Sequence, residues 1–429
     1  MDFSRTTALN ILIEYDKSGV FPNLSLKKHL RSVESKRDAA FITALVYGVI
    51  EKKLTLDYYI SKVSSVKLKK INVCVINILR LGLYQIMFMS TPVSAACNTS
   101  VDLAKKNGQY KSASFVNAIL RKLSATYNQI ELPKQKFEYL SVKYSVGVNV
   151  LSKLFDTFKD DTEALLASDV DKSLHIAVNK TKVTDSQLIA LLKLENIVAK
   201  CSEFDGLLTV EGGFDIENSS AYKNGLFHVI GIPSFVISKL AVFDNCESII
   251  DMCSAPGGKT FSVCYAYKDK VNVAAFDLHQ HKIKNMNDAI SRLGLKNVTA
   301  ILNDGTILNQ KYVNSADCVL CDVPCSGLGV INSKPDIKYN ETDFDSLVDI
   351  QYKILCCAAE YLKSGGRLIY STCTINPQEN QNQIERFLNE YNDFMPEINE
   401  NIFNGKNQYT FLPHIDKTEG FYYCVLKKK

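Results

Sequence analysis

The chain contains no tryptophan, only 10 prolines in 429 residues, and no long uninterrupted hydrophobic run. Its most apolar stretch, residues 71–89, is interrupted by Asn72, Asn77, Arg80 and Gln85. A helix that crosses a membrane needs about 20 mostly apolar residues. This stretch is therefore predicted to be a helix buried in a protein core, and no membrane contact is expected.

A secretory signal is also missing, because the N-terminal sequence MDFSRTTALN has no apolar core. The 13 cysteines would suggest a disulfide framework only in a short secreted chain, so we expect reduced thiols in a cytoplasmic protein. The 46% hydrophobic and 22% charged residues are typical of a globular protein. The length of 429 residues suggests about three domains.

The overall net charge is small, but the basic and acidic residues are unevenly distributed along the chain. The net value is +4 for 50 Lys and Arg against 46 Asp and Glu. Residues 1–125 hold 19 basic and 8 acidic side chains, a net of +11, so the remainder (31 against 38) has a net of −7. A basic module on a mildly acidic body favours a polyanionic partner, although a solvated helical surface explains the charge equally well.

Two glycine patterns that bind phosphate are missing from the stretch IIDMCSAPGGKT, residues 249–260. A P-loop requires glycine six residues before its lysine, where this chain has Cys253. A dinucleotide fingerprint would need glycines at the positions of Ser254 and Pro256. What remains is a strand, a glycine-rich turn and the start of a helix near Lys259, a unit that presents backbone N–H groups to a cofactor.

The order of patterns along the chain predicts several domains. Residues 1–125 have the periodicity of amphipathic helices, and residues 126–165 form a helix-prone connector. A small α/β unit follows over 166–235, with a capping box at Thr184 and Gln187, although it could equally be a lobe of the next domain. Residues 236–429 alternate strands with helices, which predicts a mostly parallel sheet.

An acidic residue follows each of the first four strands expected in this sheet: Asp251, Asp277, Asp304 and Asp322. Ligands of such sheets bind beyond the carboxyl ends of the strands. Asp277 suits a ribose diol, and Asp304 suits an exocyclic adenine amine, whereas carboxylates would repel phosphates. Simple helix capping is the alternative for each acid alone. The series favours a cofactor with ribose, adenine and a charged amino-acid end.

Cys325 follows the fourth expected strand and Cys373 the fifth, in the stretches CDVPCSGLGV (321–330) and YSTCTINPQEN (370–380). Adjacent strand ends should bring Cys325 and Cys373 toward one cleft. A zinc site is the rival interpretation, but Cys318 and Cys321 lie three apart on one strand and face opposite sides of the sheet. Five other cysteines of this half are most simply small core residues; they are Cys264, Cys318, Cys321, Cys356 and Cys357.

Two thiols beside a cofactor with an electrophilic methyl group suit one demanding reaction. Carbon 5 of a pyrimidine is a poor nucleophile until a thiolate adds to carbon 6, and removal of the carbon 5 proton then requires a second group. The carboxylate of Asp322 would raise the pKa of a nearby thiol. The position of the residues therefore leaves open which cysteine is the thiolate.

At these motifs a family resemblance is visible. DMCSAPGGKT, CDVPCSG, KPDIK (334–338), STCTINPQEN and the final FLPH and EGFYYCVLKK resemble RNA cytosine-5 methyltransferases that use S-adenosylmethionine. LVYGVIEKKLTLDYYI (45–60), ILRLGLYQI (78–86) and SFVNAILRKL (114–123) resemble the helical RNA-binding domain of the NusB type. Together they resemble the RsmB/Sun family of ribosomal RNA small subunit methyltransferases over nearly the full chain.

The resemblance implies a fold, an activity and a set of residues. The expected fold is an all-α NusB-like domain, a small RRM-like α/β unit and a Rossmann-like methyltransferase domain. Cys373 would attack carbon 6 of a cytosine in 16S ribosomal RNA, Cys325 would assist product release, and Asp322 would touch the base. The implied enzyme is a monomer without metal. S-adenosylmethionine would be held by Cys253, Ser254, Ala255, Pro256, Gly257, Gly258, Lys259, Asp277, Asp304 and Asp322.

The chain departs from the family pattern at two places. Val229, Ile230 and Gly231 stand where the family has Val-Gln-Asp, and Ser333-Lys334 replaces a basic pair. These departures affect the expected positioning of substrate more than the reaction type. Two alternatives remain: transfer RNA as the substrate, or a non-catalytic RNA-binding protein with a relic methyltransferase half.

Overall fold

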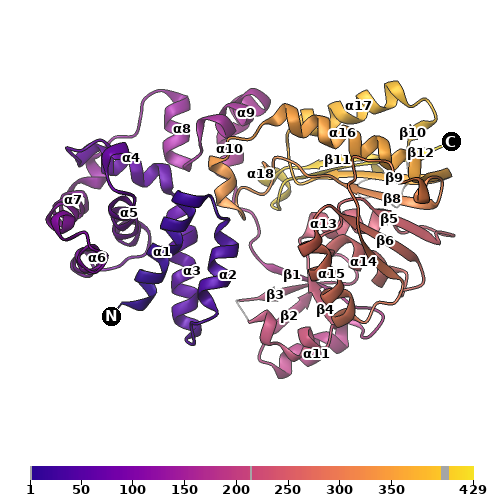
Figure 1. The fold of residues 1–429 in the computed structure, drawn as a ribbon, viewed down its shortest axis with the longest axis horizontal. Coiled ribbons are helices and arrows are strands. Elements are labelled where there is room, and N and C mark those ends of the chain that lie inside the picture. Colours follow the sequence, from indigo (N-terminus) through magenta and orange to yellow (C-terminus); the bar gives the residue numbers. More distant parts are fainter. Residues whose placement is uncertain (1, 213–214, 398–404) are drawn as a thin grey trace. The chain divides into compact units, whose positions relative to one another are not determined.

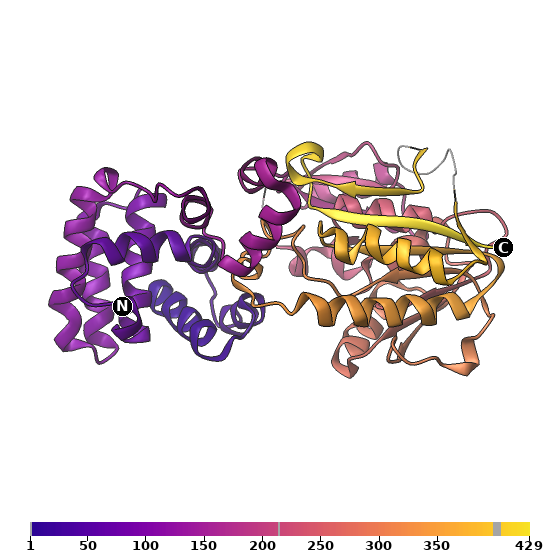
Figure 2. The same cartoon turned by 90° about the horizontal axis from the view of Figure 1, so that it is seen from above.

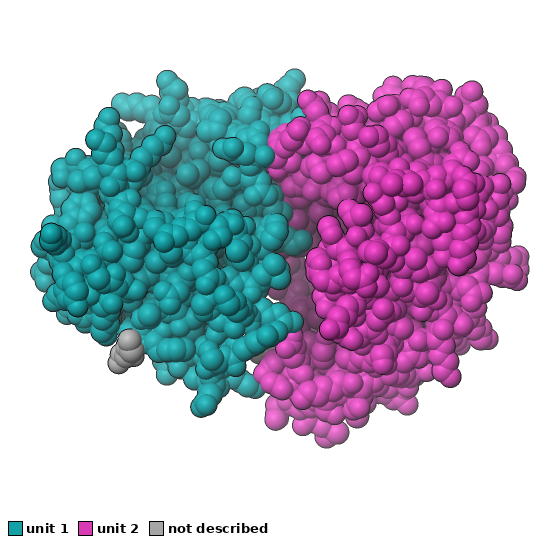
Figure 3. Space-filling model, viewed as in Figure 1, with its two compact units in different colours: residues 1–167, 334–341 teal, residues 168–333, 342–429 magenta. Residues whose placement is uncertain are grey.

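The computed structural model describes residues 2–212, 215–397 and 405–429, which form two compact units. The helical unit comprises residues 1–167 and 334–341, and the α/β unit comprises 168–333 and 342–429 (Figure 3). Within the described ranges, no helix is both long and apolar enough to cross a bilayer.

Helices make up the whole of the first unit (Figure 1). Its core is a continuous cluster of buried aliphatic side chains that includes Leu9, Leu45, Leu79 and Leu120. The helices are α1 (Phe3–Ser18), α2 (Pro22–Leu30), α3 (Lys36–Glu51), α4 (Lys53–Val63), α5 (Val73–Phe88), α6 (Val93–Lys106), α7 (Ala113–Thr126), α8 (Lys136–Tyr144), α9 (Val148–Phe158) and α10 (Thr162–Leu166). Short 3₁₀ turns are η1 (Leu68–Lys70), η2 (Tyr110–Ser112), η3 (Tyr127–Gln129), η4 (Lys159–Asp161) and η7 (Pro335–Tyr339).

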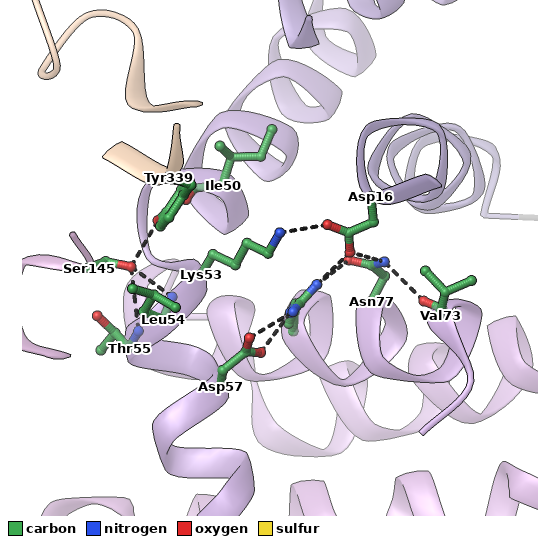
Figure 4. A network of polar contacts seen from close by, with 11 residues as sticks. Asp16, Ile50, Lys53, Leu54, Thr55, Asp57, Val73, Asn77, Ser145 and Tyr339 are labelled. Carbon is green, nitrogen blue, oxygen red and sulfur yellow. Dashed lines mark hydrogen bonds and ion pairs between the residues drawn. The ribbon is translucent and has the colours of Figure 1, made fainter. Parts of the chain in front are cut away.

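The predicted buried helix is α5, and its polar interruptions are paired inside the core. The guanidinium of Arg80 donates to both oxygens of Asp57, each at 2.7 Å, and to Asp16 at 2.6 Å (Figure 4). The Asn77 amide donates to Asp16 at 2.9 Å, and Lys53 donates to the other Asp16 oxygen at 2.6 Å. A buried charge is tolerated only when it is paired and hydrogen-bonded, as here.

The segment 334–341, which follows the Cys325 motif in the chain, belongs to the helical unit. The Tyr339 hydroxyl lies 2.9 Å from Ser145 Oγ and donates to the Ile50 carbonyl, at the end of α3 (Figure 4). The Gly147 N–H donates to the Lys338 carbonyl at 2.8 Å. A Cβ at Gly147 would lie 3.0 Å from that oxygen, so a side chain there would loosen this contact.

A small antiparallel sheet begins the α/β unit. Its strand order is β2-β3-β1-β4, with the chain order β-α-β-β-α-β of the expected RRM-like unit. The predicted capping box starts α11, since the Thr184 and Gln187 side chains accept each other's backbone N–H groups. The elements are β1 (Leu174–Val178), α11 (Asp185–Leu194), β2 (Val198–Cys201), β3 (Leu207–Glu211), η5 (Ile216–Asn218), α12 (Ser220–Lys223) and β4 (Phe227–Val229).

The larger sheet has eight strands in the order β10-β12-β9-β8-β5-β6-β7, with β11 paired to β12. Strands β5 to β9 pair in parallel, as predicted, whereas β12 runs antiparallel to β9. Its strands are β5 (Ser248–Asp251), β6 (Asn272–Asp277), β7 (Val298–Leu302), β8 (Ala316–Asp322), β9 (Leu362–Thr372), β10 (Phe394–Pro396), β11 (Gln408–Phe411) and β12 (Phe421–Lys428).

Helices cover both faces of this sheet. Figure 1 shows α13, α14 and α15 on one face and α16 and α17 on the other, and Figure 2 shows the same ribbon from above. The core beneath α16 includes Phe276, Leu355, Tyr361 and Phe387. These helices and turns are α13 (Ile232–Leu240), α14 (Gly258–Ala266), α15 (Gln280–Leu293), η6 (Gln310–Tyr312), α16 (Phe344–Tyr361), η8 (Pro377–Glu379), α17 (Gln381–Glu390) and α18 (Pro413–Asp416).

The structure adds elements that the sequence patterns did not indicate, namely the short strands β4, β10 and β11. The domain boundaries expected at residues 125, 165 and 235 stay predictions. Assignment of 334–341 to the helical unit was not anticipated, because a return of the chain after the long stretch 168–333 leaves no local pattern.

We predict that Arg80→Leu destabilises the helical unit. The substitution leaves Asp16 and Asp57 near the core without their shared cation, and we expect a loss of about 2–4 kcal/mol in the free energy of unfolding. Urea denaturation of the full chain measures it. Arg121→Leu removes an exposed guanidinium and is the matched control. An Arg80 variant as stable as the control would contradict the prediction.

Candidate active site

The glycine-rich turn joins β5 to α14 and is tied to the neighbouring strand. The backbone N–H and the hydroxyl of Ser254 both donate to the Phe276 carbonyl of β6, each at 2.8 Å. Gly257 has a φ of +107°, and a Cβ there would lie 2.3 Å from the Phe261 ring. Only glycine therefore fits at this position. The next residue, Gly258, begins α14 as the sequence predicts.

A cavity of about 180 Å³ opens beside this turn. Most residues predicted to hold the cofactor contribute to its lining, together with the stretch Val229–Gly231, in which Ile230 and Gly231 depart from the family pattern. The lining consists of Val229, Ile230, Gly231, Ser234, Asp251, Cys253, Ser254, Ala255, Pro256, Gly258, Lys259 and Asp322. The departure from the family pattern at Ile230 and Gly231 therefore changes two of the residues that line the cavity.

Charged groups in this lining are arranged in two ways. Lys259 donates to one oxygen of Asp322 at 2.6 Å, and the Ser371 hydroxyl donates to the other at 2.7 Å. The buried carboxyl of Asp251 accepts a hydrogen bond from Thr260 at 2.6 Å, and its second oxygen has no partner among the described residues. Burial raises the pKa of Asp251 to about 7.

The cavity suits the charged end of an amino acid. An orphaned buried oxygen calls for a donor, and an ammonium group would both supply one and stabilise the carboxylate of Asp251. The backbone N–H groups at the start of α14 suit a carboxylate. These residues therefore fit the amino-acid end of S-adenosylmethionine.

Asp277 and Asp304 lie farther along the same edge of the sheet. Asp277 ends β6, is buried, and accepts the His279 N–H at 3.0 Å. Asp304 follows β7 and accepts the N–H and hydroxyl of Thr306 at 2.9 and 2.7 Å. These bonds lower the pKa of Asp304. Both acids also stabilise their own turns, but neither caps a helix, because the N-cap of α15 is His279 and that of η6 is Asn309.

The two predicted thiols meet where β8 and β9 end. Cys325 Sγ and Cys373 Sγ are 3.1 Å apart, and both residues are partly exposed. The pairing of Asp322 with Ser371 in adjacent parallel strands sets this distance, because each thiol follows its strand by a few residues. Hydrogen bonding to Cys373 and burial raise the pKa of Cys325. Burial likewise raises the pKa of Cys253 above its usual range, so Cys253 stays protonated.

Sequence reasoning did not single out Glu379, although it lies in the quoted stretch STCTINPQEN. Its fully buried carboxylate accepts hydrogen bonds from Ser326, Gln351 and Asn376. Its position next to the second cysteine motif was the only available signal, and a glutamate in a polar stretch is ordinarily assigned to the surface.

A metal centre has no support in the described ranges, where no group of three or more His, Cys, Asp or Glu side chains could hold an ion. Cys318 and Cys321 are fully buried in β8, and burial raises the pKa of both thiols.

Comparison with known proteins agrees with this geometry. Residues 239–427 match the family described as "16S rRNA methyltransferase RsmB/F", and residues 3–125 match the NusB family. The chain is 31% identical to the "Probable ribosomal RNA small subunit methyltransferase B" of Bacillus subtilis (strain 168), over 99% of this chain and 98% of that protein. The chain belongs to the ribosomal RNA small subunit methyltransferase B family. As a member it is a methyltransferase with a NusB-like domain.

Another relative in this family and one solved structure extend the comparison. The ribosomal RNA small subunit methyltransferase B of Proteus mirabilis (strain HI4320) is 28% identical over 92% of both chains. The crystal structure of PH0851 superposes with a TM-score of 0.83 over 99% of both chains at 24% identity. The structural likeness supports the expected fold.

We predict that Gly257→Ala destabilises the turn and weakens binding of S-adenosylmethionine. A Cβ in this left-handed conformation clashes with Phe261, at an expected cost of about 1–3 kcal/mol. Thermal unfolding and calorimetric titration measure the two effects. Gly258→Ala is the control for thermal unfolding, because its Cβ would meet Ile230 at an ordinary 3.7 Å. Equal thermal unfolding of the two variants would be the contrary result.

Proposed function

We propose that this enzyme methylates carbon 5 of a cytosine in 16S ribosomal RNA, with S-adenosylmethionine as methyl donor. The observation that carries the proposal is the 3.1 Å contact between Cys325 and Cys373, at the strand edge that also carries the Asp251 cavity. Two thiols in contact beside a cofactor cavity provide the nucleophile and the second group that carbon 5 methylation requires.

The proposed reaction begins at Cys373. Its thiolate forms a bond to carbon 6 of the cytosine, and the electrons of the carbon 5–carbon 6 double bond move to make carbon 5 nucleophilic. S-adenosylmethionine supplies an electrophilic methyl group that carbon 5 accepts. Cys325, after losing its own proton to solvent, removes the carbon 5 proton, the double bond re-forms, and the bond between Cys373 and carbon 6 breaks. The products are 5-methylcytosine, S-adenosylhomocysteine and the Cys373 thiolate, and Cys325 again carries a proton.

The electrostatics support this division of roles. Hydrogen bonding to Cys373, burial and the negative charge of Glu379 all raise the pKa of Cys325. Cys325 therefore keeps its proton in the resting enzyme and can donate it toward Cys373, which favours ionisation of Cys373. Cys373 is then the thiolate of the pair, in agreement with the role that the family resemblance implies.

The proposed cofactor site extends along the sheet edge. The turn from Cys253 to Lys259 and the carboxyl of Asp251 would hold the amino-acid end. Asp277 would accept hydrogen bonds from the ribose hydroxyls, and Asp304 from the adenine amine. Asp322, held between Lys259 and Ser371, would lie next to both the cofactor and the base.

The proposal that the substrate is RNA rests on the N-terminal residues 1–125. Residues 1–125 match the NusB family and carry a net charge of +11, the excess of 19 basic over 8 acidic residues. Neutralised phosphates release counterions, so RNA affinity should fall as salt rises. The target base has to leave its stack to reach Cys373, which favours a single-stranded or flipped nucleotide.

We predict that binding of S-adenosylmethionine releases a proton from Asp251. This carboxyl has a pKa of about 7, and an adjacent ammonium group would lower that value. Affinity should therefore rise between about pH 6 and 7, with release of up to about one proton at pH 6. Calorimetry in two buffers of different ionisation enthalpy counts the proton. Asp251→Asn should abolish the release, and a wild-type enthalpy independent of buffer would refute the assignment.

We predict that Cys325→Ala traps the covalent intermediate. The variant retains Cys373 but cannot remove the carbon 5 proton, so a protein–RNA adduct should accumulate with small-subunit RNA and S-adenosylmethionine. A denaturing gel shows it as a slow band. The double variant Cys325→Ala/Cys373→Ala is the control and should give no band.

Other outcomes of this trap separate the alternatives. A band with transfer RNA but not with ribosomal RNA would change the substrate. A band with Cys373→Ala but not with Cys325→Ala would make Cys325 the nucleophile and Cys373 the group that assists product release. Absence of adduct and of methyl transfer with every RNA, despite cofactor binding, would favour the non-catalytic alternative.

A further inference from the structure

A single buried carboxylate lies behind the two thiols. Glu379 ends the 3₁₀ turn η8 and is fully buried. One of its oxygens accepts from the Ser326 hydroxyl at 2.6 Å and from the Asn376 amide at 2.9 Å. The other accepts from the Ser326 N–H at 2.8 Å and from the Gln351 amide at 2.9 Å. Four short bonds satisfy an ionised carboxylate, which accepts and cannot donate.

Two of these donors hold the loop that carries Cys325. Ser326 directly follows Cys325, and the Gln351 amide also donates to the carbonyl of Pro324, which directly precedes it. Glu379 therefore fixes the Cys325 loop on both sides.

The second thiol is attached to the same carboxylate. Thr374 directly follows Cys373, and its hydroxyl lies 2.8 Å from Ser326 Oγ and 3.4 Å from Glu379. The Asn376 N–H donates to that Thr374 hydroxyl at 3.3 Å. The residues after both cysteines thus converge on Glu379, and their positions set the contact between the two sulfur atoms.

The charge of Glu379 also acts on the chemistry. It favours the protonated form of Cys325, which it holds in place. A neutral side chain of the same size would keep much of the packing but would lose this effect. A glutamine at position 379 would also present its NH₂ group, a donor, to groups that are themselves donors.

We infer that Glu379 is a positioning residue that holds Cys325 and Cys373 in contact. The inference deepens the proposed function, on which it rests, by assigning the group that sets the contact between the two thiols. A glutamate that merely stabilised the loop would affect folding without changing which thiol ionises.

Site-resolved alkylation of the full chain tests this inference without RNA or cofactor. Wild-type protein and Glu379→Gln are treated with iodoacetamide over a pH series, at less than one modification per chain. Peptide mass spectrometry then gives the ratio of modification at Cys373 to that at Cys325. We expect Cys373 to react first in the wild type, and the ratio to fall about fivefold or more in Glu379→Gln, with Cys325 reacting at lower pH.

The matched control is Glu385→Gln, which removes an exposed carboxylate from the following helix α17 and should leave the ratio unchanged. A folded Glu379→Gln protein with the wild-type ratio overturns the inference. Where this variant fails to fold, Ser326→Ala decides the question, because it removes one donor and keeps the charge. A fall of about twofold supports the inference, and the wild-type ratio overturns it.

Failure here remains distinguishable from failure of the proposed function. The alkylation ratio depends on the two thiols alone. The proposed reaction is tested separately, and it is refuted when Cys325→Ala forms no adduct with any RNA. A normal adduct together with an unchanged alkylation ratio would support the proposed methyl transfer reaction and refute the positioning role of Glu379.

Discussion

Parallel pairing of β5, β8 and β9 is the constraint on which the site depends. Parallel strands end at one edge of a sheet, so every group that follows a strand faces the same space. The pairing of Asp251 with Leu320, and of Asp322 with Ser371, fixes the offset between these ends. A shift of register would separate the thiols from each other and from the cavity.

Three buried or partly buried carboxylates at this edge are stabilised in different ways. Asp322 is paired with a cation, Lys259. Glu379 is surrounded by neutral donors, which satisfy both oxygens without cancelling the charge. Asp251 has one donor, Thr260, and its pKa rises to about 7 because the remaining desolvation is uncompensated. Asp251, the carboxylate with an unpartnered oxygen, lines the cavity together with the paired Asp322.

The helical unit uses the same principle for another purpose. Arg80 joins Asp16 on α1 to Asp57 on α4, so one guanidinium connects three helices in a core of aliphatic side chains. Tyr339 is attached to this unit from the segment 334–341, a few residues after the Cys325 loop in the chain. The catalytic half thus contributes a piece of its own sequence to the NusB-like half.

The sequence alone determined the fold class, the parallel strands, the glycine turn and the residues at the strand ends. Those features are local: alternation, caps and glycines depend on neighbours in the chain, and strand ends coincide wherever strands pair in parallel. Only the tertiary structure decided what depends on distant pairs. The thiol contact, the return of Tyr339 and the burial of Glu379 each require residues that the sequence separates by nine to almost three hundred positions. The pKa values of Asp251 and Cys325 also belong to this group, because desolvation is a property of the folded surroundings and not of the residue.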